Sequence, residues 1–157
     1  MKIRFATKED VPAILNLIKG IAEYEKLLHE VTATEEILYD SLFIKKAAEV
    51  LLGEKEGTII GFALFFHNFS TFTGKRGLYL EDLYVLPEYR HQGFGKQFFA
   101  TLKKIANERE CGRMEWICLD WNASAINFYT ERLNAMPMDE WTVYRLTEKQ
   151  INESVKS

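Results

Sequence analysis

Two adjacent carboxylates, Glu81 and Asp82, lie in the middle of the otherwise hydrophobic run LYLEDLYV. A carboxylate can take a proton from an amine, directly or through water, and it can also hold a cation. Neighbouring strand residues point to opposite faces, so the alternation groups Glu81 with Tyr79 and Leu83, and only one carboxylate faces a given cleft. A bulge would change that parity. The alternative is that either carboxylate is a solvated charge at a sheet edge.

A glycine pair follows this run, in the segment EYRHQGFGKQFF that precedes an amphipathic stretch. Backbone N–H groups at a helix N-terminus are unpaired and attract anions, and Gly93 and Gly95 would let an anion approach them closely. Positive charge from Arg90 and Lys96 suits a pyrophosphate better than a single carboxylate. The other interpretation is that the glycines only make the turn into the helix.

The residues around the glycine pair exclude two nucleotide-binding patterns. A Rossmann fingerprint requires a third glycine where Phe98 stands, and a Walker loop requires Ser or Thr where Gln97 stands. The pattern that fits is R-x-x-G-x-G, from Arg90 to Gly95, which follows a predicted strand and opens a predicted helix.

Composition limits the class of protein. The chain has 157 residues, 47% hydrophobic and 27% charged, which predicts one soluble domain over residues 1–157. A net charge of -3 with scattered Lys and Arg argues against nucleic acid, and the hydrophobic runs are too short for a membrane helix. No signal peptide is recognisable, so we expect a cytoplasmic protein. Cys111 and Cys118 lack the spacing of a metal site or a disulfide, and we expect no metal.

The periodicity of hydrophobic residues places these segments on secondary structure. We expect an α/β domain in the order β-α-α-β-β-β-α-β-α-β, with a loop at 68–77 and a polar, frayed tail from Thr147. The predicted strands are 3–6, 48–54, 58–66, 78–85, 114–119 and 141–146. The predicted helices are 7–26, a shorter one from 34, one from the glycine pair to about 112, and 124–132.

Four segments in order, AEYEKL, YLEDLYV, PEYRHQGFG and LDWNASAINFY, resemble the GCN5-related N-acetyltransferase (GNAT) superfamily, and within it the spermidine/spermine and thialysine N-acetyltransferase branch. The resemblance covers nearly the whole chain. It implies the GNAT fold, a mixed central sheet flanked by helices, and acetyl-CoA as cosubstrate. It also implies a homodimer that acts on a small-molecule amine.

The resemblance also implies residue roles. Glu81 would assist deprotonation of the amine, and Tyr129 would protonate the departing CoA thiolate. Without the resemblance, the residues favour reading Tyr129 as a buried structural tyrosine, and Asn122 is read equally well as a turn residue. The implied amine contacts are Tyr24, Glu25, Glu81 and Asp82. The implied cofactor contacts are Leu83, Tyr84, Val85, Arg90, His91, Gln92, Gly93, Phe94, Gly95, Lys96, Asn122, Ala123, Ser124 and Asn127.

The sequence departs from the branch in ways that bear on substrate. The loop NFSTFTGK lacks the acidic residue of polyamine-acetylating members, so we predict a lysine-like amino acid or a short diamine rather than spermine. Asn134 replaces the usual glycine after the tyrosine helix, and segment 136–141 is short, which leaves the roles of Asp139 and Glu140 open. Two alternatives to a small-amine acetyltransferase are a protein or peptide N-acetyltransferase and a non-catalytic acetyl-CoA sensor.

Overall fold

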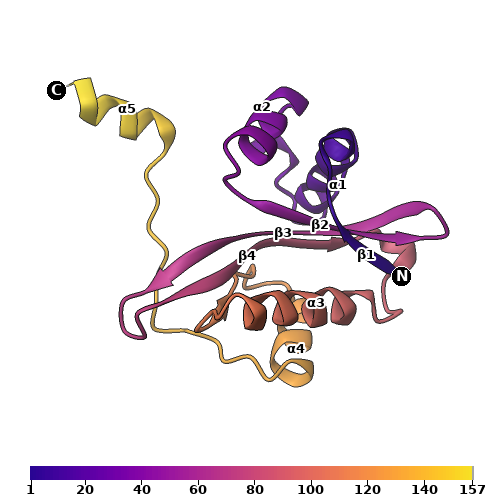
Figure 1. Ribbon diagram of the computed structural model, residues 1–157. Coiled ribbons are helices and arrows are strands. Elements are labelled where there is room, and N and C mark those ends of the chain that lie inside the picture. Colours follow the sequence, from indigo (N-terminus) through magenta and orange to yellow (C-terminus); the bar gives the residue numbers. More distant parts are fainter. Residues whose placement is uncertain (157) are drawn as a thin grey trace. The chain divides into compact units, whose positions relative to one another are not determined.

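A computed structural model describes residues 1–156. The chain forms two compact units, one from Met1 to Ile117 and a second that starts at Cys118. The first unit contains a five-stranded sheet in the order β1-β2-β3-β4-β5, with four antiparallel strands and β5 parallel to β4 (Figure 1). The expected mixed sheet is confirmed. Its strands are β1 (Lys2–Phe5), β2 (Glu49–Lys55), β3 (Thr58–Ser70), β4 (Lys75–Val85) and β5 (Met114–Glu115).

Helices cover both faces of this sheet. Helices α1 (Val11–Tyr24) and α2 (Glu35–Tyr39, followed by a π-helical turn to Ile44) lie on one face, and α3 (Phe94–Glu108) lies on the other (Figure 1). Their hydrophobic residues recur every three or four positions, which gives each helix one apolar side. On the α1 face the buried cluster is Val11, Ile14, Leu15, Leu17, Leu38, Leu42, Val50, Leu52, Phe62 and Tyr84. On α3 the buried residues are Phe94, Phe98, Phe99, Leu102, Ile105 and Ala106.

A β-bulge interrupts the pairing of β3 with β4 at the carboxylate pair. Leu64 is opposite Asp82, but the next residue of β3, Phe65, is opposite Leu80. Glu81 is therefore an extra residue with no partner across the pair, as in a bulge where two residues oppose one.

The bulge changes which side chains share a face. Tyr79 is opposite Phe66, so Tyr79 and Asp82 lie on one face although they are three residues apart. Tyr84 belongs to the core under α1, which places Asp82 on the α1 face and Leu80 on the α3 face. The simple alternation that grouped Glu81 with Tyr79 and Leu83 is wrong, because the inserted residue shifts the parity.

Strand β5 is much shorter than predicted. Residues 114–119 were expected to form a strand, but only Met114 and Glu115 pair with β4, opposite Leu78 and Tyr79. From Leu80 onward β4 has no strand partner on that side within residues 1–156.

The expected loop at 68–77 is largely strand. Asn68 pairs with Gly77 and Ser70 with Lys75, so β3 and β4 extend across most of that segment. Only residues 71–74 form the turn, where Phe72 is 96% exposed. The pairing between two long strands outweighs the low strand propensity of Asn, Lys and Gly here.

The second unit departs most from the expectation. Its helices are α4 (Ala123–Asn127), followed by a π-helical turn to Arg132, and α5 (Glu148–Lys156). The strand predicted at 141–146 is absent from the described part of the chain, and Trp141 is 74% exposed. An alternating pattern makes a strand only where a neighbouring edge is available for pairing.

The polar tail is also corrected, because it forms a helix rather than fraying. The N–H and hydroxyl of Thr147 both donate to Gln150 Oε1, at 2.9 and 3.0 Å, and Gln150 N–H donates back to Thr147 Oγ1 at 3.4 Å. This reciprocal arrangement is a capping box, which satisfies N–H groups that a helix start leaves unpaired.

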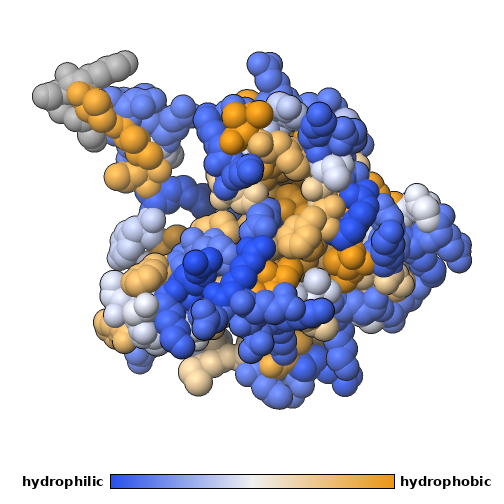
Figure 2. Space-filling model, in the orientation of Figure 1, coloured by the Kyte–Doolittle hydropathy of each residue, from blue (hydrophilic) through white to orange (hydrophobic). Residues whose placement is uncertain are grey.

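Hydrophilic residues cover most of the face shown in Figure 2, and hydrophobic residues are visible between them. Within the part of the chain that the structure describes, no helix has both the length and the hydrophobicity needed to cross a membrane.

Candidate active site

The glycine loop leads from β4 into the N-terminus of α3. Gly93 is the N-cap and has φ +82°, a left-handed conformation that favours glycine. His91 also has a positive φ, of 61°, and its side chain is exposed. No side chain caps the helix at Gly93. The first N–H groups of α3, beginning at Phe94 and Gly95, are therefore placed to meet an anion.

The basic side chains of the loop have different roles in the structure. Lys96 is exposed beside the helix N-terminus. Arg90, expected to add charge beside a pyrophosphate, donates from Nε to the Val85 carbonyl at 2.9 Å. Lys55, from the end of β2, donates from Nζ to Gln92 Oε1 at 3.3 Å and so reaches the loop from another element.

The end of β4 offers peptide groups to a ligand. The N–H of Leu86 donates to the Ile60 carbonyl on β3, at 2.8 Å. Successive residues of an antiparallel strand direct their peptide groups alternately to the two sides. Those of Leu83 and Val85 therefore point away from β3, to the side where β5 has ended, while the Tyr84 side chain is buried under α1.

A group of three carboxylates lies on the amine side of the site expected from sequence. Glu81 is exposed, whereas Asp82 and Glu25 are half-buried. The pKa of Asp82 is raised from 3.8 to about 6, chiefly by burial and then by the negative charges of Glu81 and Glu25. Burial also raises the pKa of Glu25. Carboxylates with raised pKa values lack enough compensating positive charge, which a bound ammonium would supply.

Two tyrosines border these carboxylates. Tyr24 is the last residue of α1, directly before Glu25, and its ring lies 4.7 Å from the Arg90 guanidinium carbon. Burial raises the pKa of Tyr79, and the charges of Glu81 and Glu115 add to that effect. The amine side expected from sequence thus comes from the end of α1 and the bulged part of β4.

The second unit holds the remaining expected residues. Asn122 is the N-cap of α4, and its Oδ1 accepts the N–H of Ala125 at 3.2 Å. Ala123 and Ser124 form the first turn of α4 and are exposed, as is Asn127. Tyr129 lies in the π-helical turn that follows, where it is half-buried and its ring centroid is 5.8 Å from that of Phe128.

Sequence reasoning missed two features of this site. The bulge at Glu81 has no signal in the sequence, because bulges follow from strand pairing rather than from local residue type. The contact of Lys55 with Gln92 joins residues that are distant in sequence. The R-x-x-G-x-G pattern gave the position of Arg90 but not the direction of its side chain.

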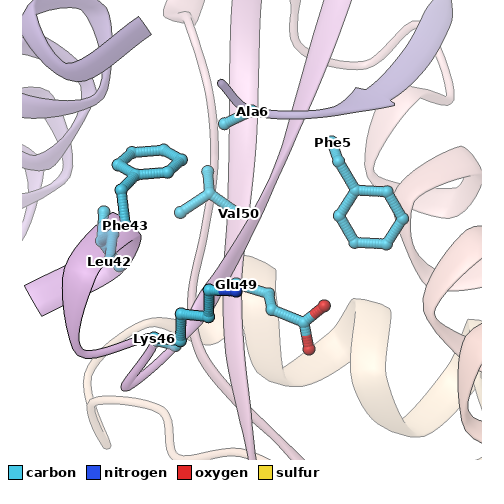
Figure 3. A pocket seen from close by; sticks show the side chains of 8 residues that line it. Phe5, Ala6, Leu42, Phe43, Lys46, Glu49 and Val50 are labelled. Atoms are coloured by element: carbon cyan, nitrogen blue, oxygen red, sulfur yellow. The ribbon is translucent and has the colours of Figure 1, made fainter. Parts of the chain in front are cut away.

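A separate hollow of about 380 Å³ lies between β1, β2 and the turn after α2 (Figure 3). Its lining is mainly hydrophobic, with Phe5, Phe43 and Val50 among the lining residues. Glu49 also lines the hollow, and its Oε1 accepts from Nη2 of Arg109, the residue directly after α3, at 2.9 Å. We assign this hollow no part in the chemistry below.

The first unit therefore combines two kinds of binding surface. Bare helix N–H groups with a left-handed glycine fit a pyrophosphate, and the outward peptide groups of Leu83 together with the N–H of Val85 fit an extended amide-containing chain. Acetyl-CoA contains both a pyrophosphate and a pantetheine arm, so the residues present fit this cosubstrate. The nearby carboxylates fit a cationic acceptor.

Comparisons with known proteins support the same conclusion. Residues 12–135 match the model of the acetyltransferase (GNAT) family. The chain is 34% identical to the thialysine N-epsilon-acetyltransferase of Mus musculus, over 97% of this chain and 95% of that protein. It is 33% identical to the L-ornithine N5-acetyltransferase NATA1 of Arabidopsis thaliana, over 93% of this chain and 84% of that protein.

The fold is also similar to that of solved structures. An integron cassette protein from the mobile metagenome of V. cholerae superposes with a TM-score of 0.81 at 23% identity, covering 99% of this chain and 98% of that one. The family match spans most of the chain, and the curated relatives cover nearly all of it. The chain therefore belongs to the acetyltransferase (GNAT) family and is an N-acetyltransferase.

Proposed function

We propose that the protein transfers the acetyl group of acetyl-CoA directly to a small primary amine, a thialysine-like amino acid or a short diamine. The observation that carries this proposal is the half-buried Asp82, whose raised pKa reflects burial near Glu81 and Glu25. An ammonium group would offset the charge of these three carboxylates. Relatives named for thialysine and L-ornithine, both small amino acids with a side-chain amine, support this acceptor class.

The donor side is proposed to use the loop and the edge of β4. Acetyl-CoA supplies an activated acetyl group as a thioester. The N–H groups at Gly93–Lys96 would hold its pyrophosphate, with charge from Lys96. A backbone N–H of Leu83 or Val85 would polarise the thioester carbonyl, because preorganised donors stabilise the charge that develops there. Asn122, Ala123, Ser124 and Asn127 would contact the donor from the second unit.

Proton transfers complete the proposal. An alkyl ammonium of pKa ~10.4 is about 0.1% deprotonated near neutral pH, so forming the nucleophile costs about 4 kcal/mol. Glu81, exposed beside Asp82, would accept this proton through water. Tyr129 would donate its Oη proton to the departing sulfur.

The proposal extends to the whole chain as one N-acetyltransferase domain, since the family match reaches from residue 12 to residue 135 and so includes parts of both units. The resemblance to the branch supports a cytoplasmic homodimer. Light scattering of the purified protein tests the dimer, and a monomer mass across concentrations would exclude it.

The acceptor is tested by thiol release from acetyl-CoA with a panel of amines. The panel contains thialysine, lysine, ornithine, putrescine, spermidine, spermine and a short peptide. We expect the highest kcat/KM for a small amino acid or short diamine. Turnover restricted to the peptide would contradict the small-amine acceptor. Binding of acetyl-CoA without turnover of any amine would contradict catalysis.

Glu81→Gln is expected to lower kcat/KM most at low pH. Below the pKa of the amine most substrate is protonated and needs a base, whereas at high pH the free amine is already abundant. We expect a loss of about 10²-fold near pH 7 that shrinks towards pH ~10. The measurement is a pH profile of kcat/KM for both proteins, and an equal loss at every pH would exclude a role in deprotonation.

A further inference from the structure

The Arg90 side chain occupies a position between three elements of the first unit. Its Nε donates to the Val85 carbonyl at the end of β4, at 2.9 Å. Its guanidinium carbon lies 4.7 Å from the centroid of the Tyr24 ring and 5.2 Å from that of the Tyr84 ring. Arg90 itself opens the glycine loop. One side chain therefore contacts both α1 and β4 from the loop.

Gly20 of helix α1 leaves room for the Tyr84 ring. A Cβ at Gly20 would stand only 2.8 Å from Cε1 of Tyr84, so the buried Tyr84 ring lies directly on the helix backbone at Gly20. Tyr24 is one turn further along the same side of the helix. The two rings thus present neighbouring aromatic surfaces, and the guanidinium lies against both.

A planar guanidinium suits this position better than an ammonium does. Arg can stack on aromatic rings and still direct Nε–H to a carbonyl in its plane, whereas Lys offers a compact charge without a plane. These contacts direct the half-buried Arg90 side chain towards α1 and β4. The basic side chain that remains exposed at the helix N-terminus is Lys96.

We propose that Arg90 is a positioning residue that couples the acetyl-CoA loop to the amine side of the site. It fixes the Tyr24 ring, and with it the end of α1 that carries Glu25, relative to the loop and the end of β4. This inference rests on the proposed function for the identity of the two ligands, but the contacts themselves lie within the first unit.

The first test compares Arg90→Lys in the loop with Arg76→Lys, the same substitution at an exposed position of strand β4. Each enzyme is assayed with acetyl-CoA and with S-acetylpantetheine, a donor that has no pyrophosphate. We expect Arg90→Lys to raise the amine KM about threefold to tenfold with both donors, and Arg76→Lys to leave it unchanged. An effect that disappears with S-acetylpantetheine would make Arg90 a phosphate contact and overturn the proposal.

A double-mutant cycle with Tyr24→Leu separates this coupling from general destabilisation. If Arg90 acts through the Tyr24 ring, Arg90→Lys will change the amine KM much less once that ring is gone. Additive effects of the two substitutions would contradict the proposed coupling.

Amide hydrogen exchange of residues 21–28 provides a readout without any ligand. In the structure the N–H of Glu25 donates to Ile21, and that of Leu27 donates to Ala22. We expect faster exchange of this segment in Arg90→Lys than in the wild type or Arg76→Lys. Unchanged exchange would overturn the proposal even if the enzyme is active. If exchange is faster in Arg90→Lys but the wild type acetylates no amine, the positioning role of Arg90 is supported and the proposed function is refuted.

Discussion

Replacing Asp82 by asparagine is expected to make the folded protein more stable at neutral pH and the enzyme much less active. The pKa of Asp82 rises from 3.8 to about 6 in the folded state, chiefly through burial and then through the charges of Glu81 and Glu25. Ionising this group therefore costs about 3 kcal/mol more in the folded than in the unfolded chain. Asparagine removes that cost, and we expect a gain of about 1–3 kcal/mol in unfolding free energy near pH 7.5.

The difference in stability between Asp82→Asn and the wild type should depend on pH. The wild type loses stability from this group as pH rises from about 4 to about 6, where the carboxyl ionises in the folded state. Asp82→Asn lacks this loss, so its advantage in denaturant titrations should be largest above pH ~6 and absent near pH ~4. Glu9→Gln, which also removes an acidic group but at an exposed position, is the control and should show no such trend. Equal stability of Asp82→Asn and wild type at all pH values would show that ionisation of Asp82 does not destabilise the folded protein.

The same variant should lose amine binding. A hydrogen bond between a carboxylate and an ammonium contributes about 1.5–3 kcal/mol, which corresponds to about 10-fold to 100-fold in kcat/KM for the amine. The wild type should show a related fall of kcat/KM as pH drops through about 6, where Asp82 becomes neutral. If the variant is more stable and fully active, Asp82 does not bind the amine.

Tyr129→Phe is expected to lower kcat about 10²-fold while acetyl-CoA affinity changes less than about twofold. The phenyl ring keeps the packing against Phe128, 5.8 Å away between centroids, and only the hydroxyl proton donor is lost. Tyr144→Phe, at a position 91% exposed, is the matched control and should behave as wild type. The measurements are steady-state kcat and acetyl-CoA binding by calorimetry.

Donors with different leaving groups then distinguish an acid from a structural tyrosine. A thioester of an aromatic thiol leaves as a stable thiolate and needs little protonation, so the loss in Tyr129→Phe should shrink with this donor. A loss of the same size with both donors would indicate that Tyr129 orients the site without donating a proton. Unchanged kcat with acetyl-CoA would exclude both roles.

The sequence predicted those parts of the fold that depend on local pattern. Helices α1 and α3 follow from residue spacing, the mixed sheet was implied by the family resemblance, and Gly93 has the left-handed geometry that a turn into α3 requires. The strand at 141–146 was predicted from equally good alternation but does not form, because pairing depends on an edge that the local sequence does not specify. The helix at α5 was missed although its T-x-x-Q start, at Thr147 and Gln150, is a recognised capping signal.

For the candidate site, the sequence identified candidate residues but not the directions in which their side chains point. The sequence singled out the carboxylate pair, but the face of each side chain depends on the bulge at Glu81, which only the pairing with β3 reveals. Likewise, the motif assigned Arg90 to the anion-binding loop. It did not predict the contacts of its guanidinium with Tyr24 and Tyr84, because these residues are far from Arg90 or on another element of the chain.

The bulge also determines which kinds of change this strand can accommodate during evolution. Leu80 and Asp82 lie on opposite faces because Glu81 is an extra residue, so deletion of Glu81 would restore regular alternation and leave the other side chains of β4 on their present faces. Deletion of a regularly paired residue, such as Leu83 opposite Ala63, would instead exchange the buried and exposed faces on one side of the deletion relative to the other. The fold therefore tolerates loss of residue 81 but not of its paired neighbours, and we expect relatives that use a carboxylate at this point as the base to keep the extra residue.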